Sequence, residues 1–223
     1  MSEKQSENVK LLDKRQATKI YQVLSQHIQP KPELQFRSAL DLLVAVVLSA
    51  QCTDKAVNAA TEKLWKHVRT AQDYLALGQK KLEEAIHSIG LYRNKAKSVL
   101  GLCEKLVAEH GGEVPSTREE LMALPGVGRK TANVVLNLWF KQPVIAVDTH
   151  IFRVAHRLRL SDKPTPEEVE LDLMQVTPKK YLLDAHHYLL LHGRYTCQAR
   201  TPQCGRCPLS KLCQCEERKR VLP

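Results

Sequence analysis

Residues 124–132 read LPGVGRKTA and connect two segments that carry helix signals. Gly126 and Gly128 lie two positions apart, and glycine adopts backbone angles that other residues resist and lets a ligand approach the main chain closely. The amides of this turn and of the following helix start would point outward as donors to an anion. No side chain here is expected to read a base, so we predict phosphate contacts without sequence preference at Gly126, Val127, Gly128 and Arg129.

The segments on either side of this turn are predicted to be helical. A capping box that begins at Ser116 or Thr117 predicts a short helix over 118–123, and a second helix is expected over 129–140. A Pro-Gly turn alone would indicate an ordinary connection between helices, but the full run is more specific. Residues 116–140 resemble the helix-hairpin-helix motif of DNA-binding proteins.

Helix signals recur along the rest of the chain, whereas strand signals are rare. Aromatic residues make up 5%, and no stretch alternates cleanly between apolar and polar residues. The helix expected over 39–51 is apolar nearly all round, which is typical of the centre of a bundle. Another long helix is expected from Pro178 to His192, closed by Gly193. These patterns predict an all-α protein.

Composition and charge narrow the classes of function. The chain has 223 residues and a formal net charge of +10, from 34 Lys plus Arg against 24 Asp plus Glu. This excess favours an anionic partner, of which nucleic acid is the commonest, although a basic protein with a solvated surface would share it. The longest apolar run, 42–50, is under half of a membrane span, and the N-terminus has no secretory signal. We therefore expect neither a membrane protein nor a secreted disulfide scaffold.

Two further residues have side chains suited to covalent catalysis. Lys130 falls in the first turn after the glycines, where the positive end of the helix dipole disfavours an ammonium ion. We expect this position to lower the pKa of the amine, which would make it a nucleophile. Asp148 begins another predicted helix after the apolar run 144–147, and it could cap that helix or face a pocket beside Lys130. Each residue alone indicates a phosphate contact or a cap, and their pairing with the glycine turn favours catalysis.

Five cysteines crowd into a basic segment near the C-terminal end, and four of them form the pattern Cys197-x6-Cys204-x2-Cys207-x5-Cys213. Without a secretory signal, such a cluster predicts metal ligands rather than disulfides. Tetrahedral zinc is the general interpretation of four cysteines, but structural zinc sites usually have two C-x2-C pairs. An iron–sulfur cluster tolerates uneven spacing, so the residues alone leave both metals open. Cys215 lies outside the pattern and is expected to be a bystander.

Together these motifs resemble the endonuclease III family, which consists of DNA glycosylases and AP lyases of base excision repair. The resemblance rests on the glycine turn with Lys130, on VDTHIFR at 147–153 and on the cysteine spacing, which occur in the family's order. It extends to LSAQ at 48–51 and IGLY at 89–92. It covers about residues 36–213.

The resemblance implies an all-α fold of two lobes with DNA held between them. One lobe would be a helical barrel over about 32–142 that contains the hairpin. The other would combine 1–31 with 143–223 and hold a [4Fe-4S] cluster on Cys197, Cys204, Cys207 and Cys213. The loop between the first two of these cysteines would present Arg200 to phosphate.

Two more residues gain a role from the resemblance. Gln51 and Leu91 would fill the gap that a flipped-out base leaves in the duplex. As alternatives, Gln51 would be a polar helix end and Leu91 an ordinary core leucine.

The implied reaction is the removal of oxidised pyrimidines from duplex DNA by a monomeric enzyme. Asp148 would help to activate Lys130, which would attack C1′ of the sugar and expel the base to form a Schiff base. β-Elimination would then cut the strand 3′ to the lesion. The partner would be double-stranded DNA with damaged pyrimidines or abasic sites, and we expect a bacterial cytoplasmic location with the nucleoid.

Two kinds of alternative remain. A monofunctional mismatch glycosylase of the same superfamily shares the hairpin, the aspartate and the cluster but usually lacks the lysine. A non-catalytic DNA-binding module with a metal site would bind DNA without forming a covalent adduct.

Overall fold

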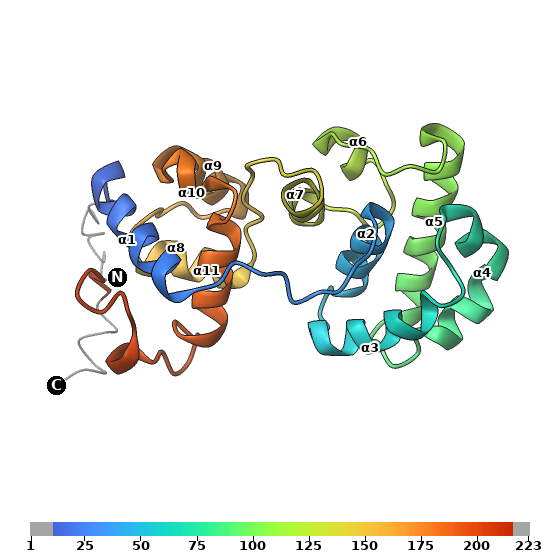
Figure 1. Cartoon of the computed structure of the whole chain (residues 1–223), viewed down its shortest axis with the longest axis horizontal. Coiled ribbons are helices and arrows are strands. Elements are labelled where there is room, and N and C mark those ends of the chain that lie inside the picture. Colours follow the sequence, from blue (N-terminus) through green and yellow to red (C-terminus); the bar gives the residue numbers. More distant parts are fainter. Residues whose placement is uncertain (1–10, 216–223) are drawn as a thin grey trace, which may run out of the picture. The chain divides into compact units, whose positions relative to one another are not determined.

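The computed structural model describes residues 11–215, and these contain α-helices and one 3₁₀ turn but no strand (Figure 1). The all-α prediction is therefore confirmed. The elements are α1 (Lys14–His27), α2 (Ala39–Leu48), α3 (Asp54–Leu64), α4 (Ala71–Ala85), α5 (Tyr92–His110), α6 (Arg118–Met122), α7 (Arg129–Leu138), α8 (Thr149–Arg157), α9 (Pro166–Val176), α10 (Lys179–Leu182), α11 (Ala185–Tyr195) and η1 (Cys204–Arg206).

The chain divides into two compact units. One, which we call the central unit, is Pro32–Gln142 and contains α2 to α7. The other, which we call the terminal unit, combines Met1–Lys31 with Pro143–Pro223, of which residues 11–31 and 143–215 are described. Each unit has its own buried apolar side chains.

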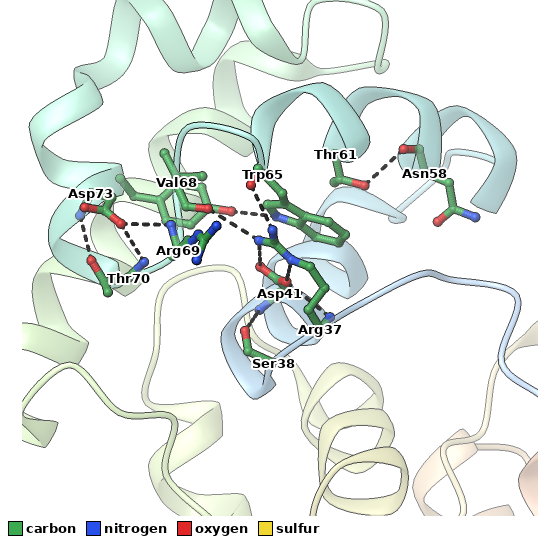
Figure 2. A network of polar contacts seen from close by, with 11 residues as sticks. Arg37, Ser38, Asp41, Asn58, Thr61, Trp65, Val68, Arg69, Thr70 and Asp73 are labelled. Carbon is green, nitrogen blue, oxygen red and sulfur yellow. Dashed lines mark hydrogen bonds and ion pairs between the residues drawn. The ribbon is translucent and has the colours of Figure 1, made fainter.

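The central unit is built around α2. Residues 40–48 are all buried, as the apolar surface of this helix predicts, and α2 contacts α3, α5 and α7. A single charge, Asp41, is buried among them. Arg37 donates from Nε to Oδ2 of Asp41 at 2.7 Å and from Nη1 to the carbonyl of Trp65 at 2.8 Å, as Figure 2 shows. This pair ties the start of α2 to the end of α3.

The terminal unit has a second core, in which α11 packs against α1 and α8. Ile20, Val154 and Leu189 are fully or almost fully buried there. A buried hydrogen bond from Thr177 Oγ1 to the Tyr21 hydroxyl, 2.8 Å long, joins distant parts of the chain. Leu209 lies in the same core, and this anchors the cysteine-rich segment to the helices.

Several helix ends differ from the sequence expectation. α2 ends at Leu48 rather than residue 51, and α7 ends at Leu138 rather than residue 140. The helix expected from Pro178 to His192 is two helices, α10 and α11. Gly193 does not close α11 but lies inside it, where a Cβ would come within 3.0 Å of Val154 Cγ2. The glycine thus serves close packing of α11 on α8.

Candidate functional site

The glycine turn in the central unit closes α6 onto α7 as a tight hairpin. The N–H of Val127 donates to the carbonyl of Leu124 at 3.1 Å, and both side chains are buried. Gly126 has a left-handed φ of 77°, and a Cβ there would lie 2.8 Å from Cβ of Ser98. Glycine is required at this position for both its backbone angle and its lack of a side chain. Gly126 and Gly128 are exposed, while Val127 uses its amide within the turn.

The helix after the hairpin starts without a capping side chain. Its N-cap is Gly128, which has no side-chain acceptor. In α1 to α4, α6, α8 and α9, by contrast, the N-cap is Asp, Ser or Thr, and its side-chain oxygen accepts a backbone N–H of the helix. The first amides of a helix need acceptors from outside the helix, and its positive end attracts anions. The N-terminus of α7 therefore suits a phosphate oxygen.

Lys130 and Arg129 occupy the first turn of α7. The side chain of Lys130 is exposed, and that of Arg129 is half-buried. An exposed amine thus lies within one turn of the amides that suit a phosphate. This arrangement allows an amine to approach a sugar next to a bound phosphate.

Gln51 and Leu91, also in the central unit, share an unusual backbone. Both are left-handed, with φ of 53° and 59°, and both are exposed. Leu91 is 61% exposed, so it is not a core leucine. Left-handed angles cost non-glycine residues roughly 1–2 kcal/mol. Strained backbone positions cluster at active sites and ligand-binding sites.

Asp148 is the N-cap of α8 in the terminal unit. Its Oδ1 accepts the N–H of His150 at 2.9 Å and that of Ile151 at 2.8 Å. The capping alternative is therefore confirmed, and the carboxylate is half-buried. Both bonds use the same oxygen. A carboxylate held in this way is fixed in orientation, which a catalytic role also requires.

Two arginines on α8 hold the chain where the cysteine segment begins. Arg157 donates from Nη1 to the carbonyl of Gln198 at 2.6 Å and from Nη2 to that of Ala199 at 3.0 Å. Arg153 donates from Nη2 to the carbonyl of Gly193 at 2.8 Å. No sequence motif indicated Arg157, although its spacing of four residues from Arg153 places both on one helix face. The exposed Arg200 follows directly on this anchored loop.

The cysteines of the predicted metal site line one pocket of the terminal unit, with Cys197, Cys204, Cys207 and Cys213 among its lining residues. Burial raises the pKa of the Cys197 and Cys213 thiols and raises that of Cys207 to about 11. Thiols desolvated in this way become thiolate ligands when metal cations lie among them. The donor set therefore fits a metal centre.

The pocket does not by itself choose between the two metals that the spacing leaves open. Four cysteines suit tetrahedral zinc as well as an iron–sulfur cluster. Among the described residues, no group of three or more His, Cys, Asp or Glu side chains is already gathered as it would be around one ion.

Two further groups reach the same pocket. Cys215, expected to be a bystander, is one of its lining residues. His192 is 1% exposed, and its Nε2 lies 4.0 Å from the sulfur of Cys207. Burial lowers the pKa of His192 to about 4, so the ring is neutral near pH 7. No sequence spacing indicated either group.

The predicted residues thus fall into two sets. The hairpin glycines, Lys130, Gln51 and Leu91 belong to the central unit. Asp148, Arg200 and the four cysteines belong to the terminal unit.

Two family profiles match the sequence. The profile of the HhH-GPD superfamily of base excision DNA repair proteins matches residues 44–179, and that of the iron–sulfur binding domain of endonuclease III matches residues 197–213. The hairpin and the cysteine pattern fall within these two ranges. The chain is therefore a helix-hairpin-helix protein of base excision repair.

Similar proteins identify the family within this superfamily. Endonuclease III of Haemophilus influenzae is 51% identical over 86% of this chain and 92% of that protein, and that of Escherichia coli K12 is 50% identical over 85% and 90%. A trapped covalent intermediate of an endonuclease III with DNA superposes with a TM-score of 0.89 at 46% identity, covering 96% of this chain and all of that one. A thermostable thymine-DNA glycosylase, at 24% identity and a TM-score of 0.78, shares the fold.

The chain belongs to the endonuclease III family. It is a DNA glycosylase and AP lyase of base excision repair, and its cofactor is a [4Fe-4S] cluster. In the described part of the chain, no helix has the length and apolar character needed to cross a membrane.

Proposed function

We propose that this enzyme removes oxidised pyrimidines from duplex DNA and cleaves the resulting abasic site through a Schiff base on Lys130. The observation that carries the proposal is an exposed amine in the first turn of α7, directly after the glycine hairpin. A phosphate bound at the uncapped helix start would hold the damaged nucleotide within reach of this amine. The endonuclease III relative that was trapped as a covalent intermediate with DNA supports a covalent route.

The chemistry assigns a distinct step to each residue. The amine of Lys130 attacks C1′ and the base leaves, and opening of the sugar ring then yields the iminium. Asp148, fixed by its two hydrogen bonds to α8, stabilises the positive charge that develops on the sugar. Loss of a proton from C2′ then expels the 3′ phosphate. Hydrolysis of the imine releases Lys130.

In this proposal, three features of the enzyme hold the DNA. Gly126, Val127, Gly128 and Arg129 form the phosphate-binding hairpin, in which the amide of Val127 closes the turn. Gln51 and Leu91 fill the gap left by the extruded nucleotide, a role suited to exposed side chains on strained backbone. Arg200, exposed on the loop that Arg157 anchors, meets a further phosphate. The active species is a monomer that works at the nucleoid.

The cluster has a structural role in this proposal. Cys197, Cys204, Cys207 and Cys213 would hold it, and its iron cations would stabilise their half-buried thiolates. These four residues hold the loop that carries Arg200. The terminal unit is then the cluster domain, and the central unit is the helical barrel domain with the hairpin over about 116–140.

Borohydride trapping tests the nucleophile. Wild type, Lys130→Gln and Lys141→Gln are incubated with a duplex that contains one abasic site, and the imine is reduced to a stable adduct. We expect an adduct with wild type and Lys141→Gln and none with Lys130→Gln. Lys141 is an exposed lysine that follows the other end of the same helix, so it controls for loss of charge. An adduct with Lys130→Gln would overturn the assignment.

One further variant, Asp148→Ser, separates the charge of Asp148 from its role as the N-cap of α8. Asp148→Ser keeps an oxygen that can cap α8, whereas it removes the charge. We expect Asp148→Ser to fold as wild type does but to form the adduct about 10²-fold more slowly, in line with typical charge-stabilising groups. A wild-type rate for this variant would leave Asp148 as a cap only.

Incision of duplexes that contain thymine glycol, compared with incision of duplexes that contain unmodified thymine, tests the substrate class.

A further inference from the structure

Cys215 is a fifth thiol in the pocket that holds the cluster. It lines this pocket together with Cys197, Cys204, Cys207 and Cys213. The family profile of the iron–sulfur domain ends at Cys213, so the resemblance assigns no role to the residue two positions later. A cluster of four irons needs four cysteine ligands. The pocket therefore contains one thiol more than the cluster uses.

The chain around Cys215 is held in place rather than merely adjacent in sequence. Gln214, between the two cysteines, accepts a hydrogen bond on Oε1 from Nη1 of Arg159 at 3.2 Å. Cys213 and Cys215, which flank this residue in the sequence, both line the pocket. Cys215 is thus fixed beside the last of the four expected ligands.

We propose that Cys215 is a reserve ligand of the cluster, able to bind the iron that Cys213 otherwise holds. This proposal rests on the four-cysteine ligand set given above. In the exchange, the bond from iron to the sulfur of Cys213 breaks and one to the sulfur of Cys215 forms. Cys215 loses its thiol proton and Cys213 gains one, so no electron transfer and no further reactant is needed. The exchange would retain the cluster when Cys213 is lost or chemically blocked.

The other unassigned groups of the chain are less suited to this role. Cys52 and Cys103 belong to the central unit. His192 lies in the pocket, and its buried Nδ1 has no hydrogen-bond partner within the described residues. It contacts Cys207, however, rather than Cys213. Cys215 is the thiol held beside Cys213, and the experiment below separates it from His192.

Iron and acid-labile sulfide content of the full-length protein, purified without oxygen, tests the proposal. We expect Cys215→Ser to retain wild-type iron, because Cys215 is not needed while Cys213 is present. Cys213→Ser should retain most of its iron with an altered visible and EPR spectrum, whereas Cys213→Ser/Cys215→Ser should lose it. Cys52→Ser, a half-buried cysteine of the central unit, controls for removal of a thiol elsewhere.

Each other outcome overturns the proposal in a distinct way. Equal iron loss in the single Cys213→Ser and the double variant would show that Cys215 cannot substitute. Iron loss in Cys215→Ser would make it an obligatory ligand. Retention in the double variant would assign the substitution to another donor such as His192. Wild type without iron would instead refute the cluster itself, and so the proposed ligand set.

Alkylation shows which cysteine sulfurs are bound to iron, and it tests the proposal even if most of the Cys213→Ser protein fails to fold. Iron-loaded protein is treated with iodoacetamide, and the sites are mapped by mass spectrometry on the folded, iron-containing fraction. In wild type we expect Cys215 to be alkylated and Cys213 to be protected. In the iron-containing fraction of Cys213→Ser we expect Cys215 to become protected. Alkylation of Cys215 in that fraction would contradict its binding to iron.

Discussion

Lys95 on α5 carries an amine that is buried without a hydrogen-bond partner in the described structure. Burial lowers the pKa of this amine below its ordinary value of 10.5, an effect that the nearby thiol of Cys52 partly opposes. Replacement by methionine, which has a similar shape, should raise the free energy of unfolding by about 1–2 kcal/mol near neutral pH.

The pH dependence of this gain follows from the direction of the shift. The penalty for burying the charge is fully present below the folded pKa of Lys95 and disappears as the pH rises through 10.5. Urea unfolding of wild type and Lys95→Met should therefore differ near pH 7 and converge at alkaline pH. A gain that stays constant with pH would mean that Met packs better and that charge burial contributes little.

At Leu91, stability of the fold and binding of DNA favour different residues. Its left-handed backbone costs roughly 1–2 kcal/mol, and glycine would relieve it while losing about 0.5–1 kcal/mol of chain entropy. Leu91→Gly should therefore unfold at the same or a higher urea concentration and bind a duplex with an abasic site more weakly. Lys141 has a similar φ of 55° and is the matched position for stability. Equal duplex binding by Leu91→Gly and wild type would contradict insertion of the leucine.

Among the elements, α7 illustrates how an uncapped helix start serves a ligand. Gly128 has an extended backbone, and a Cβ there would meet nothing within 4 Å, so serine fits. Gly128→Ser should supply the missing cap and leave stability equal or raised by up to about 0.5 kcal/mol. Its hydroxyl would compete with phosphate for the same amides, so duplex affinity should fall. Unchanged affinity in a filter-binding titration would argue against phosphate at this helix start.

The neighbouring Gly126 should give the opposite result. Gly126→Ala introduces a Cβ that would lie 2.8 Å from Ser98 Cβ on a backbone with φ of 77°. We expect a loss of about 1–3 kcal/mol in the free energy of unfolding from strain and overpacking. Thermal unfolding of the two variants side by side separates the structural glycine from the binding glycine.

For the whole molecule, the cluster should stabilise one unit and not the other. All pocket-lining cysteines belong to the terminal unit, and Leu209 joins their segment to its core. Binding to the folded state alone stabilises the part that forms the site. Removal of iron by a chelator should therefore speed amide hydrogen exchange in α8 and α11 and leave α2 and α5 unchanged. Equal acceleration in both units would mean that they unfold together.

The site could be predicted in part because its signals are local in sequence. The hairpin glycines, the lysine after them and the cysteine spacing each lie within a short segment, since turn geometry and metal ligation act over few residues. Arg157 and His192 were not predicted, and Cys215 was expected to be a bystander. Their positions depend on a pocket formed by segments that are separated by up to 58 residues, from Arg157 to Cys215. An exposed Leu91 was expected only from the resemblance, because a leucine beside a helix start ordinarily packs inward.

Local sequence patterns predict the helical class, most helix starts and the family, because caps, apolar periodicity and motif spacing are properties of neighbouring residues. The family in turn identifies the reaction and the [4Fe-4S] cofactor. Tertiary structure alone decided that Gly193 lies within α11, that Gln51 adopts a left-handed backbone after α2, and that five thiols share one pocket. These outcomes depend on which side chains meet across the fold, and such contacts follow from packing rather than from local sequence.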